Sequence, residues 1–274
     1  MQKRLALLVV LVMFAVGACG GSGQKSDGLR AAAAKTVGAR SARTAVTLVT
    51  TTTMQPAPST TKGEGAVDFA SKRASFAIDT SSLGLPGVSG TVEIVLVDGI
   101  IYAKLPNLLP TKPWLKLDRT TLGAAGGASA AGLGDLASGD PASGIRFLEG
   151  VADGATKVGK EKVRGTDTTH YRGTVDLIKI KASASTGTRT AIDALVKQLG
   201  KSTYPVDVWL DGAGRVRRLR SRHASPARGA TPASTVVRTE EYFDFGVKVD
   251  ASPPPPDQVT DLAQLLKGAG RPAG

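Results

Sequence analysis

The chain has 274 residues and a formal charge of +12, from 35 Lys and Arg against 23 Asp and Glu. This length suffices for one large domain or two small ones. The single Cys excludes an intramolecular disulfide framework and a Cys-rich zinc site, and two His residues disfavour a His-built metal centre. A mean hydropathy near zero argues against a polytopic membrane protein.

The N-terminus has the layout of an export signal. Lys3 and Arg4 precede the uncharged run 5–18, which is too short to cross a bilayer core because a spanning helix needs about 20 residues. The run ends in small residues directly before Cys19, and a Gly/Ser-rich stretch follows. This arrangement resembles the lipobox of a bacterial lipoprotein signal. The alternative is an ordinary signal peptide with a coincidental Cys.

In such signals the Cys thiol receives a diacylglyceryl group and becomes the first residue after cleavage. The resemblance therefore implies that 1–18 is a lipoprotein signal peptide and that Cys19 is the site of lipid attachment. Residues 19–28 would then be the lipidated Cys and a flexible tether. The protein would be lipid-anchored at the extracytoplasmic face of the cell membrane.

The first half of the mature chain predicts one helix followed by strands. Residues 29–42 are Ala-rich and suit a helix, and the β-branched run after them predicts a strand that Pro56 and Pro58 break. Asp98-Gly99 between two apolar runs predicts a hairpin with a type I′ turn. Strands are expected at 43–54, 65–70, 73–80, 89–97, 100–105 and 114–118.

The second half mixes helices and hairpins. Residues 122–144 are mostly Gly and Ala and predict either a loop or a weak helix. Asp140-Pro141 predicts the start of a short helix through Leu148. A further helix is expected at 188–199 and a last one after Asp257, beyond the polyproline spacer 252–256. Strands are expected at 156–163, 168–178, 204–210, 215–223 and 235–249.

These elements predict an α+β fold. About eleven strands follow one another without β-α-β alternation, which disfavours a parallel sheet. The economical architecture is one large, strongly curved antiparallel sheet closed off by a few helices. It forms a single domain over 29–267, and residues 268–274 are expected to be a disordered tail.

The sequence offers no catalytic constellation. It contains no Gly-x-Ser-x-Gly elbow, no Walker loop and no spaced set of metal ligands, so neither an enzyme nor a cofactor nor a metal is predicted. His170 falls on the polar face of its strand and is expected to face solvent, and His223 ends an Arg-rich strand. Glu240 and Glu241 are adjacent and therefore point to opposite faces.

The run 215–222 contains five Arg residues. One interpretation is contact with anionic lipid headgroups, and the other, which we favour, is a solvated basic face of the sheet. Nucleic acid is a poor candidate, because the chain is predicted to be exported and lacks interleaved aromatic residues. The headgroup candidates are Arg215, Arg217, Arg218 and Arg220.

A set of apolar residues alternates along the predicted strands. These side chains either form the core beneath the helices or line a cavity for acyl chains. The candidates for such a cavity are Phe69, Phe76, Ile78, Ile94, Leu96, Tyr102, Val206, Val208 and Leu210.

Four segments carry a resemblance to a known group. The segments 101–105 (IYAKL), 113–118 (PWLKLD), 168–177 (TTHYRGTVDL) and 205–211 (PVDVWLD) follow a lipobox. Together they resemble the LolA-like / LppX–LprAFG group of actinobacterial envelope lipoproteins. The Gly/Ala-rich stretch 122–144 departs from the ordered helical lid of that group.

The resemblance implies a half-barrel of antiparallel strands whose concave side, covered by helices, holds acyl chains. Such a protein would be a monomer that carries a lipid or a lipidated molecule through the envelope and catalyses no reaction. The alternative is a sensor or binding module of the same fold that engages an envelope protein partner at an exposed sheet edge.

Overall fold

The structure is a computed structural model. It describes residues 23–81, 90–105, 109, 111–118, 140–151, 155–184, 186–227, 229 and 232–269. The predicted signal peptide, Cys19, the start of the tether, most of the Gly/Ala-rich stretch and the end of the predicted tail lie outside the described residues.

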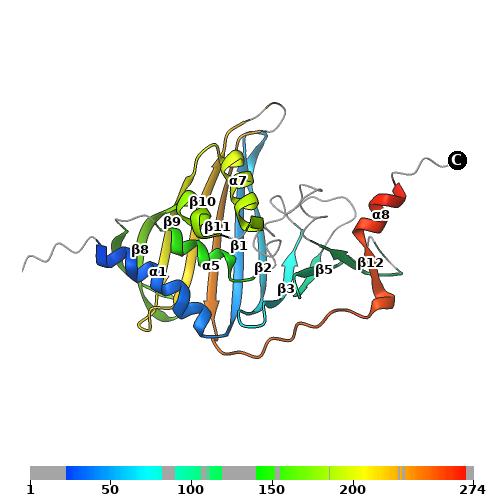
Figure 1. Ribbon diagram of the computed structural model, residues 1–274, viewed down its shortest axis with the longest axis horizontal. Coiled ribbons are helices and arrows are strands. Elements are labelled where there is room, and N and C mark those ends of the chain that lie inside the picture. Colours follow the sequence, from blue (N-terminus) through cyan, green and yellow to red (C-terminus); the bar gives the residue numbers. More distant parts are fainter. Residues whose placement is uncertain are drawn as a thin grey trace, which may run out of the picture.

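Twelve strands form a single open, curved sheet (Figure 1). All neighbouring strands are antiparallel except β12 and β6, which confirms the predicted α+β class with one large antiparallel sheet. The spatial order is β12-β6-β5-β4-β3-β2-β1-β11-β10-β9-β8-β7. The strands are β1 (Ser41–Thr52), β2 (Gln55–Asp68), β3 (Arg73–Asp79), β4 (Thr91–Val97), β5 (Ile100–Lys104), β6 (Trp114–Leu117), β7 (Thr156–Val163), β8 (Thr166–Asp176), β9 (Thr203–Leu210), β10 (Val216–Ser225), β11 (Ser234–Phe243) and β12 (Val259–Asp261).

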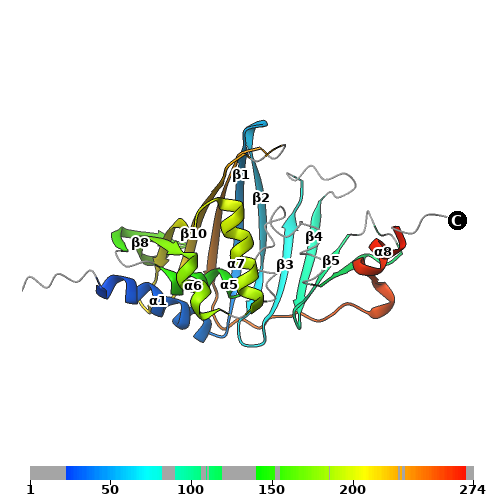
Figure 2. The same cartoon turned by 45° about the horizontal axis from the view of Figure 1, so that its top comes forward.

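Most helices lie on one face of the sheet, over the half that contains β8 to β11 (Figures 1 and 2). We call this face the inner face and the opposite one the outer face. The inner face carries α1 (Gly23–Gly38), α5 (Ser143–Arg146), the 3₁₀ helix η1 (Phe147–Gly150), α6 (Leu177–Ser183) and α7 (Thr186–Leu199). The remaining helix, α8 (Leu262–Ala269), contacts β6 and β12 at the far end, after the short 3₁₀ helix η2 (Pro256–Gln258).

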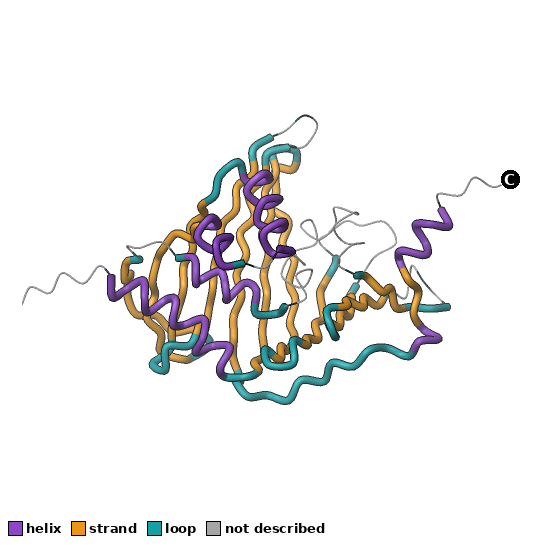
Figure 3. Tube along the Cα trace, viewed as in Figure 1, coloured by secondary structure: helices purple, strands orange, loops and turns teal. Residues whose placement is uncertain are grey.

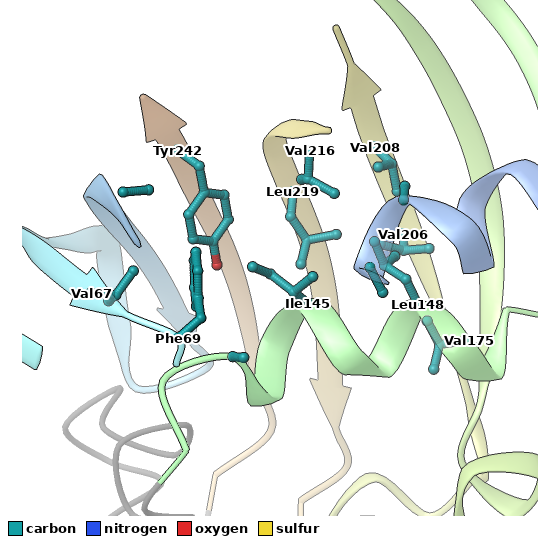
Figure 4. Close-up of a cluster of buried hydrophobic side chains, with 14 of the residues drawn as sticks. Val67, Phe69, Ile145, Leu148, Val175, Val206, Val208, Val216, Leu219 and Tyr242 are labelled. Atoms are coloured by element: carbon teal, nitrogen blue, oxygen red, sulfur yellow. The ribbon is translucent and has the colours of Figure 1, made fainter. Parts of the chain in front are cut away.

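The core lies between these helices and the sheet (Figure 4). Ile145 and Leu148 of the α5–η1 segment pack over apolar side chains of β9 and β10 and are fully buried. Helix α1 adds a buried stripe that contains Leu29 and Thr36, and the Thr36 hydroxyl accepts a hydrogen bond from the Val216 backbone N–H at 2.8 Å. The helices therefore close the inner face over this half of the sheet.

Local turn chemistry explains the predicted hairpins. Asp98 and Gly99 join β4 to β5 with φ values of 52° and 76°, which is the positive-φ pair that a type I′ turn requires. Arg164 and Gly165 make a similar turn between β7 and β8, with φ values of 47° and 78°. The predicted hairpin at Asp98-Gly99 is therefore confirmed.

Strand β2 is longer than predicted, because it continues through Pro56 and Pro58. Its other neighbour, β3, pairs only with the segment Lys62–Asp68. The proline-containing half of β2 therefore has a described partner only in β1. Proline lacks an N–H for the ladder but is tolerated where one edge of a strand is unpaired.

The helix boundaries also differ from the prediction. Helix α1 begins at Gly23, so residues 23–28 of the predicted tether are helical (Figure 3). Helix α6 replaces the end of a predicted strand, because the Asp176 side chain accepts a hydrogen bond from the Ile178 backbone N–H and caps a helix there. The final helix is capped by Asp261 rather than by Asp257, since the Asp261 carboxylate accepts from the Ala263 backbone N–H.

Candidate ligand-binding face

The strand register arranges the inner face of β1 to β5 in cross-strand rows. The first row, called the Phe76 row, contains Tyr242, Thr44, Gly65, Phe76, Ile94 and Ala103. The next, called the Ile78 row, contains Leu219, Glu240, Val46, Gly63, Ile78 and Val92. Directly opposed side chains in a sheet lie on the same face, so each row forms a continuous strip. Toward β4, both strips are apolar.

Two glycines on β2 set the shape of these rows. A Cβ added at Gly65 would come within 2.1 Å of the Ser75 carbonyl oxygen and 2.8 Å of Phe76 Cδ1. A Cβ at Gly63 would lie 3.1 Å from Ile78 Cγ1. Glycine inside a strand typically marks a bend or a close approach of side chains. The absent side chains let Phe76 and Ile78 lie across β2 toward β1.

Four of the predicted cavity residues come together on the inner face of β3 and β4. Ile94 and Leu96 are buried, while Phe76 and Ile78 are half-buried. Leu96 belongs to an adjacent row with Ala74 and Ile101 that is fully buried. Exposure therefore increases from Leu96 toward Ile78. We call the inner-face side chains of β3 and β4, namely Phe76, Ile78, Ile94 and Leu96, the apolar wall. The Phe76 and Ile78 rows are its accessible part.

Four other predicted residues lie elsewhere in the core. Val206, Val208 and Leu210 occupy the inner face of β9, and Val206 and Val208 lie opposite Leu148 in the close-up view (Figure 4). Phe69 follows β2 and packs against Tyr242 with ring centroids 6.3 Å apart. The covering helices occupy the space above β9, so these side chains are core residues rather than a free wall.

Tyr102 lies on the other face, so its grouping with the apolar wall was wrong. It opposes Val95 on β4 and Lys116 on β6, whereas its neighbours Ile101 and Ala103 point inward. The prediction placed Tyr102 by its apolar surroundings in the sequence. Alternation along β5 puts it on the outer face instead.

The arginines proposed as headgroup contacts also lie away from the apolar wall. The Asp211 carboxylate accepts hydrogen bonds from Arg215 Nε at 3.1 Å and from Arg217 Nε at 3.0 Å, and both guanidiniums stack over Phe245. Burial by itself raises the pKa of Asp211. Hydrogen bonds from the Arg215 backbone N–H and from the two guanidiniums outweigh it, so the pKa lies below its usual value.

Arg218 and Arg220 follow the same pattern on the outer face. Arg218 donates to Glu241 Oε1 through Nε at 2.9 Å and through Nη2 at 2.6 Å, and it stacks over Trp209. Arg220 is exposed and opposes Asp207 on β9. Carboxylates therefore offset part of the charge of the basic run, and Arg218 and Arg220 lie on the face opposite to Phe76 and Ile78. The strand pairing has a bulge between Val216 and Arg218, where the run enters β10.

His170 lies on the polar outer face as alternation predicts, but it is buried rather than solvent-facing. Its ring stacks on Trp209 with centroids 4.2 Å apart. Nε2 lies 2.7 Å from Asp207 Oδ1, and Nδ1 lies 3.0 Å from Glu161 Oε1. Neighbours from β7 and β9 thus enclose this side chain, and they are distant in the sequence.

The outer face also contains a hollow of about 390 Å³. Ala77, Val95 and Phe243 contribute to its lining, together with five charged residues: Arg43, Glu64, Glu93, Lys248 and Asp250. An acyl chain in this hollow would remove those charges from water without giving them new partners, which is costly. The hollow therefore does not suit acyl chains.

Sequence reasoning missed a charged pair on the inner face. Arg238 Nη2 donates to Glu240 Oε1, and the Tyr242 hydroxyl donates to Glu240 Oε2 at 3.0 Å. These three residues occupy alternate positions of β11, so the pattern Arg-x-Glu-x-Tyr placed them on one face. Glu240 and Glu241 face opposite sides of the sheet, as predicted.

No group of three or more His, Cys, Asp or Glu side chains within the described ranges could hold a metal ion. Within the same ranges, no helix is both long enough and apolar enough to cross a membrane.

Sequence comparison finds relatives in Streptomyces, while no family model matches the chain. A protein of Streptomyces griseus, described as an uncharacterised 31.2 kDa protein in the rplA–rplJ intergenic region, is 28% identical over 196 residues. This match covers 69% of the chain and 62% of the relative. A protein of Streptomyces coelicolor named as a candidate lipoprotein is 28% identical over 158 residues, which are 57% of the chain and 45% of that relative. The chain thus spans less than two thirds of either relative.

Structure comparison finds mycobacterial proteins among the neighbours of this fold. The chain is similar to LppX and LprF. The lipoprotein LppX of Mycobacterium tuberculosis has 17% identity and a TM-score of 0.46, over 82% of this chain and 99% of LppX. LprF of Mycobacterium bovis has 15% identity and a TM-score of 0.49, over 84% of this chain and 97% of LprF. The resemblance predicted from the sequence is confirmed as a resemblance, and neither likeness assigns a ligand to this chain.

Proposed function

We propose that this chain is an envelope lipoprotein that binds the acyl chains of a lipid or lipidated molecule on the inner face of β1 to β5. The observation that carries the proposal is the apolar wall of the Phe76 and Ile78 rows, whose central side chains remain half-buried beside a filled core. Burying such a surface against hydrocarbon contributes about 25 cal/mol per Å². The protein would take part in lipid or lipoprotein transfer without catalysing a reaction.

Attachment to the extracytoplasmic face of the cell membrane is part of this proposal. Cys19 would carry a diacylglyceryl group, and two acyl chains suffice for stable anchoring at about 0.8 kcal/mol for each buried CH₂ group. One Streptomyces relative is itself named as a candidate lipoprotein, which supports this anchor. The anchored chain would work as a monomer close to the membrane.

The alternative of a peptide-binding sheet edge receives less support. Strand β7 ends the sheet on one side and exposes Lys157, Lys160 and Lys162. Lysines on an edge strand typically prevent pairing with another chain. At the other end, β12 has only three residues. A protein partner that engages another surface is an outcome that the following experiment can reveal.

Native mass spectrometry of the chain from Gly20, expressed in a bacterium of related envelope chemistry, tests the proposal. We expect adducts of lipid mass that disappear when the protein is denatured. The adduct masses would give the class of ligand. A protein without adducts, which also gains none when incubated with diacyl lipids, would contradict the proposal and favour the protein-binding alternative.

A further inference from the structure

The edge strand β7 and its hairpin partner β8 carry an excess of basic side chains. The hairpin 156–172 contains five basic residues and two carboxylates, so its net charge is +3 with His170 counted as neutral. All five basic side chains are exposed, namely Lys157, Lys160, Lys162, Arg164 and Arg172. Because β7 ends the sheet, this charge lies along one edge of the molecule.

The three lysines lie on the inner face of this edge. Lys157 and Lys160 oppose residues of β8 whose partners on β9 are Val208 and Leu210, both on the inner face. Lys162 is two residues beyond Lys160 and therefore shares its face. The lysines are thus on the same side of the sheet as α1.

The two arginines of the hairpin are engaged on the other side of the sheet. Arg164 and Arg172 donate to carboxylates of β11 and β9 on the outer face, at 2.6 and 3.0 Å. Lys162 donates to Asp167 at 2.6 Å, but their side chains are 65% and 88% exposed, and such surface pairs hold their partners weakly. The lysines are therefore the basic groups that this edge offers to a partner.

Helix α1 runs across the strands toward this edge. Near its C-terminal end, Thr36 accepts a hydrogen bond from the backbone of Val216 at the start of β10. Leu29 lies over β8, since a Cβ added at Gly173 would be 3.9 Å from its Cδ1. The two helix positions are about 10 Å apart along the axis, and β8 and β10 are also separated by about 10 Å. The helix therefore crosses the strands almost at a right angle.

The same direction carries the start of α1 to β7. Gly23 is about 9 Å farther along the helix than Leu29, whereas β7 lies only about 5 Å beyond β8. Figures 1 and 2 show this end of α1 at the end of the sheet beside β8. Cys19 precedes Gly23 by four residues, which span at most about 14 Å. A lipid on Cys19 would therefore hold the membrane close to the β7 edge.

The chemistry of the edge suits an anionic membrane surface. Such a surface attracts lysines that come within about 8 Å of it at physiological salt. Val158, which lies between Lys157 and Lys160, is 50% exposed and adds an apolar group to the contact. Lysines on an edge strand also disfavour pairing with another protein strand, so they leave this edge free for the bilayer.

We propose that the β7 edge is a membrane-contact surface, where Lys157, Lys160 and Lys162 bind anionic phospholipid headgroups. The contact orients the anchored domain with β7 toward the bilayer and the apolar wall several strands away from it. This inference rests on the anchor at Cys19 that the proposed function includes, but it does not require acyl-chain binding.

Lysine acetylation of the vesicle-tethered chain tests this orientation. Cys19 is the single Cys of the chain, so a maleimide lipid attaches the mature protein to vesicles at that position alone. The vesicles contain phosphatidylcholine, either alone or with an equal part of phosphatidylglycerol. A brief pulse of acetylating reagent and peptide mass spectrometry then give the reactivity of each lysine.

We expect the three edge lysines to react about tenfold more slowly on the anionic vesicles than on the neutral ones. Each lysine near an anionic surface favours contact about fivefold, and three lysines favour it about 100-fold. High salt should remove the protection, because it screens the charges. Lys72 and Lys112 are exposed at the β2–β3 turn and before β6, in the other half of the sheet, and should react equally on both vesicles.

Two variants of equal charge show whether the edge itself makes the contact. In Lys157→Gln/Lys162→Gln the contact should weaken about 25-fold, so the remaining Lys160 should lose its protection. The matched variant Lys72→Gln/Lys112→Gln removes two lysines from the far half and should leave Lys160 protected. The wild-type comparison requires no substitution, so a folding defect in a variant cannot hide its result.

Several outcomes would overturn the membrane-contact surface. Equal acetylation of Lys160 on neutral and anionic vesicles would exclude the contact, and protection of Lys72 and Lys112 instead would place the opposite end on the bilayer. Loss of protection in both variants would show an effect of net charge rather than of this edge. Adducts with diacyl lipids would still report acyl-chain binding, and the intact mass of the protein extracted from membranes would report lipidation of Cys19, so these proposals can fail separately.

Discussion

Asp211 illustrates how much a single carboxylate organises in the turn between β9 and β10. Its side chain is 4% exposed and accepts hydrogen bonds from the backbone N–H groups of Ala213 and Arg215 as well as from two guanidiniums. It thereby closes the turn between β9 and β10 and compensates the charge of Arg215 and Arg217. Shared carboxylates such as Asp211 and Glu241 thus offset part of the charge of the basic run.

We expect Asp211→Asn to lower the free energy of unfolding at pH 7 by about 1–3 kcal/mol, because charged hydrogen bonds are lost. The pKa of Asp211 is lowered in the folded protein, so its contribution is complete above the unfolded pKa of about 3.9 and is lost as the pH falls through the folded value. Urea unfolding at pH 7 and pH 3 checks this. Asp250→Asn, at an exposed position, is the control, and an equal deficit at both pH values would contradict the explanation.

Alternation in the sequence predicted which face a residue occupies better than how deeply it is buried. His170 was assigned to the polar face correctly, but its burial depends on Trp209, Glu161 and Asp207. These partners come from other strands, and only the strand register brings them together. Tyr102 shows the converse, since its apolar character suggested the inner face although its position on β5 is an outer one.

Among the helices and strands, a turn or helix cap could be predicted from the sequence where all of its residues are neighbours in the chain. Asp98-Gly99 gave the β4–β5 hairpin. The short helix expected after Asp140-Pro141 does form, but it starts at Ser143 with Ala142 at its N-cap, and Asp140 accepts from the Ala142 backbone N–H in the turn before it. The elements that were missed depend on distant partners. Strand β12 exists as a strand because it pairs with β6, which lies more than 140 residues earlier in the chain. No local pattern of three residues predicts such pairing.

The β12–α8 unit is held by few described contacts, and Asp261 supplies two of them. Its carboxylate accepts from the Ala263 backbone N–H at 2.9 Å and pairs with Lys116 Nζ at 3.2 Å, and the Lys116 hydrogen bond lowers its pKa. Loss of a helix cap typically costs about 1 kcal/mol. We expect Asp261→Ala to increase hydrogen exchange in the segment 256–269 while the β8–β11 half stays protected.

Hydrogen-exchange mass spectrometry measures this difference segment by segment. Asp257→Ala is the matched control, because Asp257 is an exposed carboxylate four residues earlier that was expected to cap the same helix. It should leave exchange unchanged. Equal acceleration in both variants, or acceleration that spreads to β9 and β10, would show that Asp261 does not act locally on this unit.

At the scale of the whole molecule, the sheet separates two kinds of surface. Ion pairs and stacked cations cover the outer face, including Arg218 with Glu241 and Arg164 with Glu241. Helices cover the inner face over β8 to β11 (Figure 2). Apolar side chains form the inner face of β3 and β4. The predicted fold class required only the order of strands and helices. Which part of the inner face is filled depends on where the helices pack, and the sequence pattern does not specify this.

This division predicts that the protein is stabilised by lipid through one face only. A ligand at 100 times its dissociation constant stabilises the folded state by about 2.7 kcal/mol, so a diacyl lipid should raise the Tm of the mature chain by several degrees. Ile78→Asp places a charge in the apolar wall and should abolish this rise. Ala77→Asp places the same charge one residue away on the exposed outer face and should retain it.

Thermal unfolding of the three proteins, with and without a diacyl lipid, provides the measurement. Both variants carry the same new carboxylate on the same strand, and it points to opposite faces. Because position 77 also opposes Glu64 and Glu93, the Tm rise of each variant is measured against its own lipid-free Tm. Loss of the Tm rise in both variants would indicate a general effect of charge on β3. Retention in both would mean that lipid does not contact the Ile78 row, and the ligand would then have to bind outside the apolar wall.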